Sequence, residues 1–350
     1  MPSYINKKYE AQHLADIKRE QLRVDALYIK TIDKIFKEAA HLKPKGNIFS
    51  IDQYPEFSKK VDKILLEFNK DVNITLVNGI KGQWELAIDK NANIIHKLYD
   101  KDKIVDQVNR MIYDPQSAAL EEFTNRKIAG LGISDRVFKY TNQFRAEIEQ
   151  GLYVGVNDGT PAARMARDQK QYLQQPDKLF RRVQHINRRG ENVLKLSKSA
   201  QSYKPGKGVY RSAYKNAMRL TRDTVNDAYR QSDMVRYQTL PFILSYSVNL
   251  SNNHPRTDIC DDLKGTYPKT FVWLKWHNQC LCNCTSNLAS PADFDRYQNA
   301  ILNGTDKDFK FTGVVTSVPN NFTDYVTKNT GMMDNWKRKP DWVLTNDVKI

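Results

Sequence analysis

The sequence predicts an α+β fold, in which long helices come first and a few short strands lie near the C-terminal end. Amphipathic patterns fill roughly the first 100 residues, as long helices require. Apolar runs at Ile243–Val248 and Phe271–Trp276 predict two strands. Loops rich in Asn, Pro, Thr and Asp follow to the end of the chain, so we expect an irregular tail there.

Three regions follow from this pattern. We expect residues 1–110 to form a helical docking region, 111–290 a mostly helical domain with a small β-containing C-terminal part, and 291–350 an irregular C-terminal tail. The central domain contains a basic block at 178–222 and a segment rich in cysteine and histidine at 254–284.

The docking region is predicted to consist of two long helices. The first covers about residues 9–40, and Pro44 with Gly46 ends it. Ser50 is a plausible cap for the second, whose apolar residues recur every three, four or seven positions as far as Leu98. Two such helices would most easily form an antiparallel hairpin or a stalk, with the apolar stripes as packing surface.

Shorter helices are predicted in the central domain. Ser134 is a candidate cap for a helix that reaches Gln150. Thr160 and Pro161 favour a helix start, and that helix would end near Leu173. The pattern at about 210–239 predicts a further long helix.

Composition limits the class of protein. Apolar residues make up 40% and charged residues 27% of the 350, which is typical of a globular chain and not of a disordered one. The first residues show no signal peptide, and no window approaches the ~20 apolar residues of a membrane span. We therefore expect synthesis in a cytoplasm, reduced cysteines and no membrane partner.

Most of the net charge of +15 lies in the basic block. Between Lys178 and Arg222 there are 13 basic residues and one acid, Glu191, so this stretch carries +12. Such a block predicts a polyanionic partner, most simply nucleic acid, although a solvated basic face is the alternative interpretation. The candidate contact residues are Lys178, Arg181, Arg182, Arg188, Arg189, Lys195, Lys198, Lys204, Lys207 and Arg211.

All four cysteines and two of the six histidines lie between His254 and Cys284. Thiolate and neutral imidazole are the ligands that tetrahedral zinc prefers, so a structural zinc ion is one interpretation of this segment. Buried reduced thiols are the other, because no CxxC pair is present. Cys280, Cys282 and Cys284 alternate, so a strand would place them on one face. The candidate ligands are Cys260, His277, Cys280 and Cys282, with His254 as an alternative.

The order of these motifs resembles the Mu F-type phage head-morphogenesis proteins, the minor head proteins of tailed phages. The resemblance covers about residues 120–290. It rests on a helix with Arg222-Asp223, Asn226 and Tyr229, a loop with Cys260 and Gly265, and a closing His277, Cys280 and Cys282. The chain departs from the family pattern at Thr257, Asn278 and Leu281, which replace a cysteine, a proline and an arginine.

The resemblance implies a structural virion protein and not an enzyme, so no catalytic residue is expected. It implies few copies inside the capsid at the portal vertex, after synthesis in the bacterial host's cytoplasm. The implied partners are the portal protein, other head proteins and packaged double-stranded DNA, bound without sequence specificity. The implied roles are head morphogenesis and DNA packaging or ejection. Some members are compared with ADP-ribosyltransferases, which implies a core of that kind.

An enzyme is the alternative function: an ADP-ribosyltransferase-like toxin or a metal-dependent nuclease. The first would need a late catalytic Glu, and no Glu follows Cys284. The second would need clustered carboxylates for Mg²⁺. Asp258, Asp261 and Asp262 form such a cluster, but we interpret them as residues of a capped turn.

Overall fold

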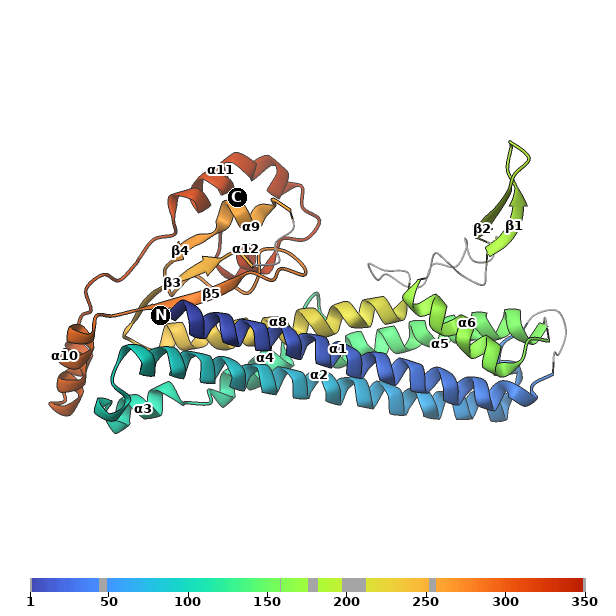
Figure 1. Cartoon of the computed structure of the whole chain (residues 1–350), viewed down its shortest axis with the longest axis horizontal. Helices are drawn as coiled ribbons and strands as arrows, with labels where there is room; N and C mark the ends of the chain where they lie inside the picture. The colour runs from blue at the N-terminus through green and yellow to red at the C-terminus, as the bar shows by residue number, and fades with distance from the viewer. Residues whose placement is uncertain are drawn as a thin grey trace. The chain divides into compact units, whose positions relative to one another are not determined.

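The computed structural model of the chain is an α+β structure, mostly helical with a small antiparallel sheet in its C-terminal part, as predicted (Figure 1). It describes residues 2–43, 49–157, 159–175, 182–196, 212–251 and 256–348. The chain forms two compact units. Unit 1 comprises Met1–Ile17, Gly79–Thr124 and Asp223–Ile350, and unit 2 comprises Lys18–Asn78 and Asn125–Arg222.

Three long helices contribute residues to both units: α1 (Pro2–Glu38), α2 (Pro55–Leu98) and α8 (Ala213–Thr239). Unit 2 adds α5 (Ile133–Asn157), α6 (Ala162–Gln174), β1 (Arg182–Ile186), β2 (Asn192–Leu196) and the 3₁₀ turns at Ala39–His41 and Ile51–Gln53. The predicted long helices are therefore present. Ser50 caps the 3₁₀ turn that precedes α2, not α2 itself.

The apolar stripes of α1 and α2 form the core of unit 2. Tyr28 of α1 is buried, and its ring centroid lies 4.7 Å from that of Phe68 in α2 and 4.6 Å from that of Phe144 in α5. Surface ion pairs Lys34–Glu67 and Lys60–Glu38 show that α1 and α2 run antiparallel here. The predicted antiparallel arrangement is confirmed for this unit.

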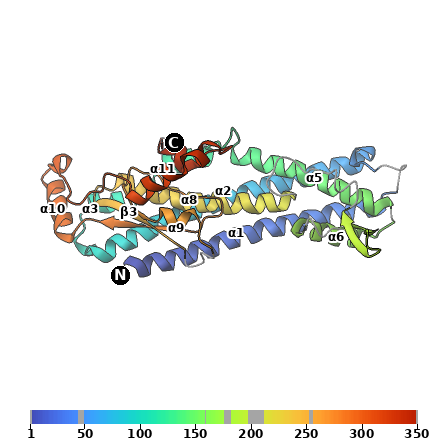
Figure 2. The ribbon, with the colours of Figure 1, turned by 90° about the horizontal axis from the view of Figure 1, so that it is seen from above.

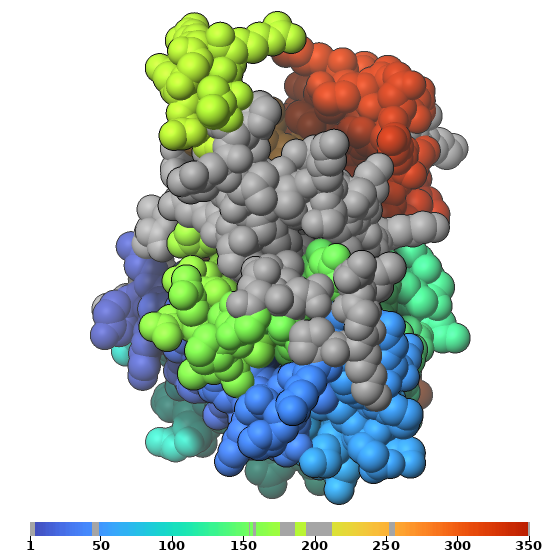
Figure 3. Space-filling view, turned by 90° about the vertical axis from the view of Figure 1, so that its right-hand side faces the viewer, coloured from blue at the N-terminus to red at the C-terminus, as the bar shows by residue number. Residues whose placement is uncertain are grey.

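Close packing of α6 on α5 depends on two glycines. A Cβ atom on Gly151 would collide with the side chain of Gln169, and one on Gly155 with that of Met165. Glycine at both positions therefore lets the two helices approach. In Figure 3 the α6 segment and the neighbouring ends of α1 and α2 cover one end of this unit.

Strands β1 and β2 form an antiparallel hairpin within the basic block, where no strand is predicted from the sequence. Asn187 begins the connecting turn, and its side-chain oxygen accepts hydrogen bonds from the backbone N–H groups of Arg189 and Glu191. Gly190 has φ of 82°, a left-handed conformation that glycine adopts without strain. Arg188 and Arg189 are exposed on this turn.

Unit 1 combines parts of α1, α2 and α8 with a sheet and short helices. Its further elements are α3 (Asp106–Ile112), α4 (Ser117–Asn125), β3 (Ile243–Asn249), α9 (Ile259–Leu263), β4 (Gly265–Tyr267), β5 (Asn283–Leu288), α10 (Pro291–Leu302), α11 (Asn320–Asp334), α12 (Asp341–Thr345) and the 3₁₀ turns Lys101–Lys103 and Asp306–Asp308. Within this unit the first turns of α1 lie beside α2 and α8 (Figure 2), and His13 contacts Gln83 and Asn226.

The sheet of unit 1 has the order β4-β3-β5, and both pairs are antiparallel. Tyr246 of β3 lies opposite Tyr267 of β4 and Ser286 of β5. The prediction of a strand at Ile243–Val248 is confirmed. Phe271–Trp276 is not a strand, because the backbone N–H and C=O of Val272 bond to the side chain of Asn346 instead of a neighbouring strand. Its aromatic side chains are buried, which explains the apolar pattern.

Residues between Ala92 and Ile112 and residues after position 290 both contribute to the hydrophobic core of unit 1. Tyr99 stacks on Phe294, with ring centroids 3.7 Å apart. The compact units therefore differ from the three consecutive regions predicted from the sequence.

The C-terminal tail, which was expected to be irregular, contains three helices: α10, α11 and α12. Ser290, Pro319 and Pro340 are their N-caps, so this Ser- and Pro-rich pattern marks helix starts.

Candidate metal site and a buried ion-pair cluster

Helix α9 positions Cys260 in unit 1. The N-cap residue Asp258 accepts a hydrogen bond from the backbone N–H of Cys260 at 2.7 Å, and its own N–H donates to Asp261 at 2.8 Å. This reciprocal pair is a capping box, which satisfies the free N–H groups at a helix start. The interpretation of these aspartates as residues of a capped turn is confirmed for Asp258 and Asp261, and Cys260 is buried.

Cys280 and Cys282 lie on the segment that leads into β5. Gln279 has φ of 65°, and the N–H of Cys280 bonds to the carbonyl of His277, which makes a tight turn. The Sγ atoms of Cys260 and Cys280 are 3.6 Å apart. The sulfurs of Cys260, Cys280 and Cys282 all lie within 4.8 Å of one another, and all three side chains are buried. We call these three residues the thiol cluster.

His277 lies on the more open side of Cys260. Its Nε2 atom is 3.2 Å from Oδ2 of Asp258, and both side chains are more than one-third exposed. Ligand atoms of Asp258, Cys260 and His277 form a second group within 4.8 Å. The structure thus brings the three predicted cysteines together and places His277 beside Cys260. The alternative ligand, His254, lies outside the described residues.

These groups lie close enough to hold a metal ion. Hydrogen bonds from the thiols of Cys260 and Cys282, and then from the backbone of Trp276 and Cys282, lower the pKa of Cys280. The same sharing raises the pKa of Cys260, because its proton is held between the sulfurs. The cluster therefore stabilises one thiolate, and a bound cation would favour deprotonation of the other two thiols.

Cys284 does not join the thiol cluster, so the expectation that three alternating cysteines share one strand face is wrong. Cys280 and Cys282 precede β5, and Cys284 lies within it. The Cys284 Sγ atom lies 3.6 Å from the Tyr237 hydroxyl and 3.5 Å from Oδ2 of Asp233. Burial raises the pKa of its thiol to about 12. Cys284 is a packed, reduced thiol.

Unit 1 also contains a second polar cluster, and this cluster was not predicted from the sequence. Arg230 binds both carboxylate oxygens of Glu10, at 2.8 and 2.6 Å, and Lys90 binds Asp233 at 2.6 Å. We call these four residues the ion-pair cluster. The side chains of Arg230, Lys90 and Asp233 are at most 1% exposed. Its charges come from α1, α2 and α8 and sum to zero.

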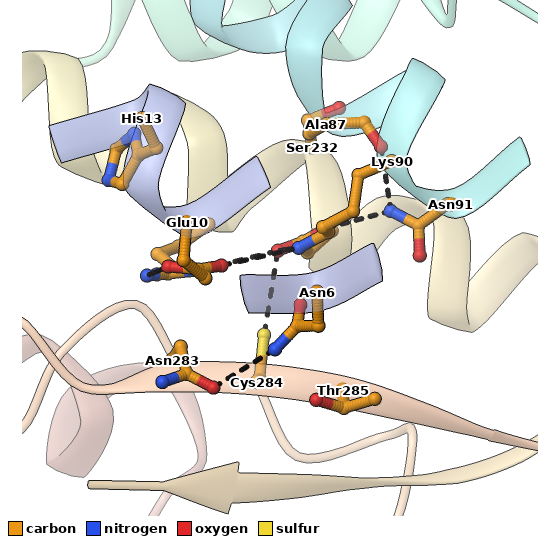
Figure 4. A network of polar contacts seen from close by, with 12 residues as sticks. Asn6, Glu10, His13, Ala87, Lys90, Asn91, Ser232, Asn283, Cys284 and Thr285 are labelled. Atoms are coloured by element: carbon orange, nitrogen blue, oxygen red, sulfur yellow. Dashed lines mark hydrogen bonds and ion pairs between the residues drawn. The ribbon is translucent and has the colours of Figure 1, made fainter. Parts of the chain in front are cut away.

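The ion-pair cluster continues toward β5 (Figure 4). Arg230 donates to the backbone carbonyl of Cys282 at 3.0 Å. Asn6 donates to the side-chain oxygen of Asn283 at 3.1 Å, so the first turns of α1 are tied to the segment beside the thiol cluster. Burial alone would raise the pKa of Glu10, but the charge and hydrogen bonds of Arg230, then Lys90, lower it to about 2.

The sequence signal for the ion-pair cluster was weak. Arg230 and Asp233 are three residues apart on a helix, which is also what a solvated helical face shows. Their partners Glu10 and Lys90 are 220 and 143 residues away. Only the tertiary structure shows that these charges are buried together.

His13 is a fully buried histidine next to the ion-pair cluster. Its Nδ1 atom lies 2.5 Å from Oε1 of Gln83, and its Nε2 atom 3.1 Å from Oδ1 of Asn226. The ring stacks on Tyr229, with centroids 4.1 Å apart. Burial, and then the positive charge of Arg230, lower the pKa of His13, so the ring is neutral in the folded protein.

Part of the basic block is described. Arg188 and Arg189 are exposed on the β1–β2 turn, and Arg182 and Lys195 belong to β1 and β2. The other predicted contact residues lie outside the described residues; these are Lys178, Arg181, Lys198, Lys204, Lys207 and Arg211. Nucleic-acid binding by this block stays a prediction.

No protein-family model, no curated protein and no solved structure matches the chain. The resemblance to phage head proteins and the ADP-ribosyltransferase-like core therefore stay predictions. None of the helices that the structure describes combines the length and apolar character needed to cross a membrane.

Proposed function

We propose that this chain is a structural minor head protein of a tailed phage, bound inside the capsid near the portal and in contact with packaged DNA. The observation that supports this most is the convergence of Cys260 with Cys280 and Cys282. The family resemblance rests on the loop and the closing motif that carry these residues. A shared function for the two motifs requires that they meet, and in this structure they do.

Structural zinc fits the residues at this site. Three buried sulfurs, one of them favoured as a thiolate, form the soft donor set that zinc selects, and His277 lies beside Cys260. A zinc ion there would cross-link the α9 loop to the segment before β5. Three cysteines and one imidazole fill a tetrahedral site, which leaves no position for a reactive water. The role of the metal would be to hold the fold of unit 1.

The DNA contact is assigned to the basic block. The exposed pair Arg188 and Arg189 on the hairpin turn can approach a phosphate backbone. Charge alone gives affinity that does not depend on base sequence and that falls steeply with salt. Such binding suits a protein that meets whatever sequence the capsid contains.

Association with heads tests the function directly. We expect the protein in purified particles of the phage that encodes it, in few copies, when particles are analysed by quantitative mass spectrometry. Cys260→Ser should abolish zinc binding and incorporation, whereas Cys284→Ser, a buried cysteine outside the thiol cluster, should retain both. Particles that contain the portal protein but lack this chain would contradict the proposal.

Metal content tests the zinc assignment. Purified full-length protein should carry about one equivalent of zinc, as structural sites do. Less than about a tenth of an equivalent, together with a melting temperature that a chelator does not change, would leave reduced thiols as the correct interpretation.

DNA binding is tested by salt titration with random duplexes. Arg188→Gln with Arg189→Gln should weaken binding to every duplex and reduce the slope of log affinity against log salt by about 2. The control changes the same charge elsewhere in unit 2, with Lys63→Gln and Lys70→Gln, both exposed on α2. Equal effects of the two pairs would remove the hairpin turn from the DNA interface.

A further inference from the structure

Asp258 contacts two candidate ligands of the metal site at once. Its Oδ1 atom accepts a hydrogen bond from the backbone N–H of Cys260, at 2.7 Å. Its Oδ2 atom lies 3.2 Å from Nε2 of His277. Both oxygens of the carboxylate are therefore engaged, so Asp258 suits the support of ligands better than direct coordination.

Both ring nitrogens of His277 face hydrogen-bond acceptors. Nε2 faces the Asp258 carboxylate, and Nδ1 lies 2.8 Å from the carbonyl oxygen of Asn278. A neutral imidazole can donate to only one of these two acceptors. Carboxylate–histidine pairs orient metal-binding imidazoles by accepting from the nitrogen that does not bind the metal. With a cation beside Cys260, Asp258 would accept from Nε2–H, and Nδ1 would bind the cation in place of its contact with Asn278.

We propose that Asp258 is the positioning residue of the metal site, and that it makes His277 the fourth ligand, through Nδ1. One carboxylate oxygen fixes the helix end that carries Cys260, and the other fixes the imidazole. This inference rests on the metal site proposed above. It explains why the ligands on the open side of the site come from two separate loops and still meet with defined geometry.

Asp258→Asn separates the two contacts. The amide oxygen still accepts from the N–H of Cys260, so the cap of α9 is kept. The amide NH₂ group then faces Nε2 of His277, and a donor there moves the ring proton to Nδ1, where it blocks the metal. We expect zinc affinity to fall roughly 10–100-fold, as for other changes next to metal ligands. Affinity is measured on the full chain by competition with a chromophoric chelator.

Asp261→Asn is the matched control. It makes the same charge change in the same capping box, but Asp261 bonds to the backbone N–H of Asp258 and has no part in the group formed with His277. We expect unchanged zinc affinity. Asp258→Ser is a second variant, which can still cap α9 but is too short to reach His277. Asp258→Ser should lower the affinity for zinc as Asp258→Asn does. It takes the place of Asp258→Asn if Asp258→Asn fails to fold.

Cobalt(II) identifies the fourth ligand. In the wild-type protein we expect the intense visible bands of a tetrahedral thiolate site, and His277→Ala should change them. If wild-type protein binds neither zinc nor cobalt, the proposed metal site fails and this inference with it. If it binds both, but His277→Ala leaves the spectrum unchanged or Asp258→Asn leaves the affinity unchanged, the metal site stands and the inference is overturned.

Discussion

The thiol cluster and the ion-pair cluster lie in the same unit and meet at Cys282, but they satisfy their charges differently. Arg230 and Lys90 neutralise Glu10 and Asp233 entirely with protein groups. The thiol cluster is different, because the groups that shift the pKa values of Cys260 and Cys280 are other thiols and backbone groups. A charge-balanced cluster is complete as folded, whereas a set of thiolates is completed by a cation.

Charge balance separates a structural polar cluster from a binding site. Both clusters are buried and both contain shifted pKa values, so neither property identifies a ligand site alone. The sum of the formal charges within a cluster shows better whether the cluster needs a ligand. The ion-pair cluster should therefore respond to mutation and acid but not to chelators, and the thiol cluster should respond to chelators.

The largest effect is expected from Arg230→Met. It leaves Glu10 buried without its bidentate partner and removes the donor to the Cys282 carbonyl. Breaking one partner of a buried pair lowers the free energy of unfolding by about 3–5 kcal/mol. Urea unfolding followed by tryptophan fluorescence measures this for unit 1 alone, because all five tryptophans lie there: Trp84, Trp273, Trp276, Trp336 and Trp342.

The control for Arg230→Met is Lys103→Met. Lys103 forms an ion pair with Asp100 at 3.0 Å in the same unit, but both side chains are exposed. We expect no measurable change in the urea midpoint, since surface pairs contribute little. Equal destabilisation by the two variants would show that the ion-pair cluster is not a buried structural element.

Metal removal should have the next largest effect, and only through the thiol cluster. At zinc concentrations 100 to 1,000 times the dissociation constant, bound metal adds about 3–4 kcal/mol to the free energy of unfolding. A chelator should therefore lower the unit 1 melting temperature of wild-type protein by roughly 2–4 °C per kcal/mol lost. Cys260→Ser should melt at the same temperature with and without chelator. A chelator effect that persists in Cys260→Ser would place the metal elsewhere.

Acid should weaken the ion-pair cluster through Glu10. Its folded pKa of about 2 lies below the ordinary 4.5, so the stabilisation is complete above about pH 4.5 and is lost as the pH falls toward 2. That shift corresponds to roughly 3 kcal/mol. Glu10→Gln should flatten the urea midpoint against pH in this window. The exposed Glu121→Gln is the control; metal loss in acid affects all the proteins alike.

The smallest effect concerns His13. Its folded pKa is lowered from 6.5, so the unfolded chain binds a proton first and stability falls as the pH drops below 6.5. Removing the titrating ring with His13→Gln should reduce the pH dependence between 6.5 and the Glu10 window; His96, whose pKa burial also lowers, contributes to what remains. A midpoint that declines identically in the variant would show that His13 does not contribute.

The sequence predicted what depends on local pattern. Apolar spacing indicated α1, α2 and α8, and the thiol-rich segment indicated Cys260, Cys280 and Cys282 as partners. The apolar pattern was misleading where a side chain, and not a neighbouring strand, forms hydrogen bonds with the backbone. The aromatic residues of Phe271–Trp276 indicated burial correctly, but Asn346 satisfies the backbone of Val272, so no strand forms.

What depends on distant contacts was not predictable from one chain. Glu10 and Lys90 belong to helices on which most of the other charged residues face solvent, and nothing local marks these two as buried. The sequence marks Asp258 only as part of an acidic turn, because its second contact is with His277, 19 positions later. The packing of the tail into the core could not be predicted for the same reason, because its helices are stabilised by residues far away in sequence.

The contact between Arg230 and Glu10 has a consequence for the timing of folding during synthesis. The two residues are 220 positions apart, and Asn283, the hydrogen-bond partner of Asn6, is synthesised 277 positions later. A ribosome adds about 5–20 residues per second, so the first turns of α1 remain without these partners for roughly 10–60 s after they emerge. During that interval Glu10 is in water and the helix has its apolar face uncovered. Unit 1 therefore closes late, from both ends of the chain together, and a nascent-chain chaperone would find its binding sites in the first 17 residues.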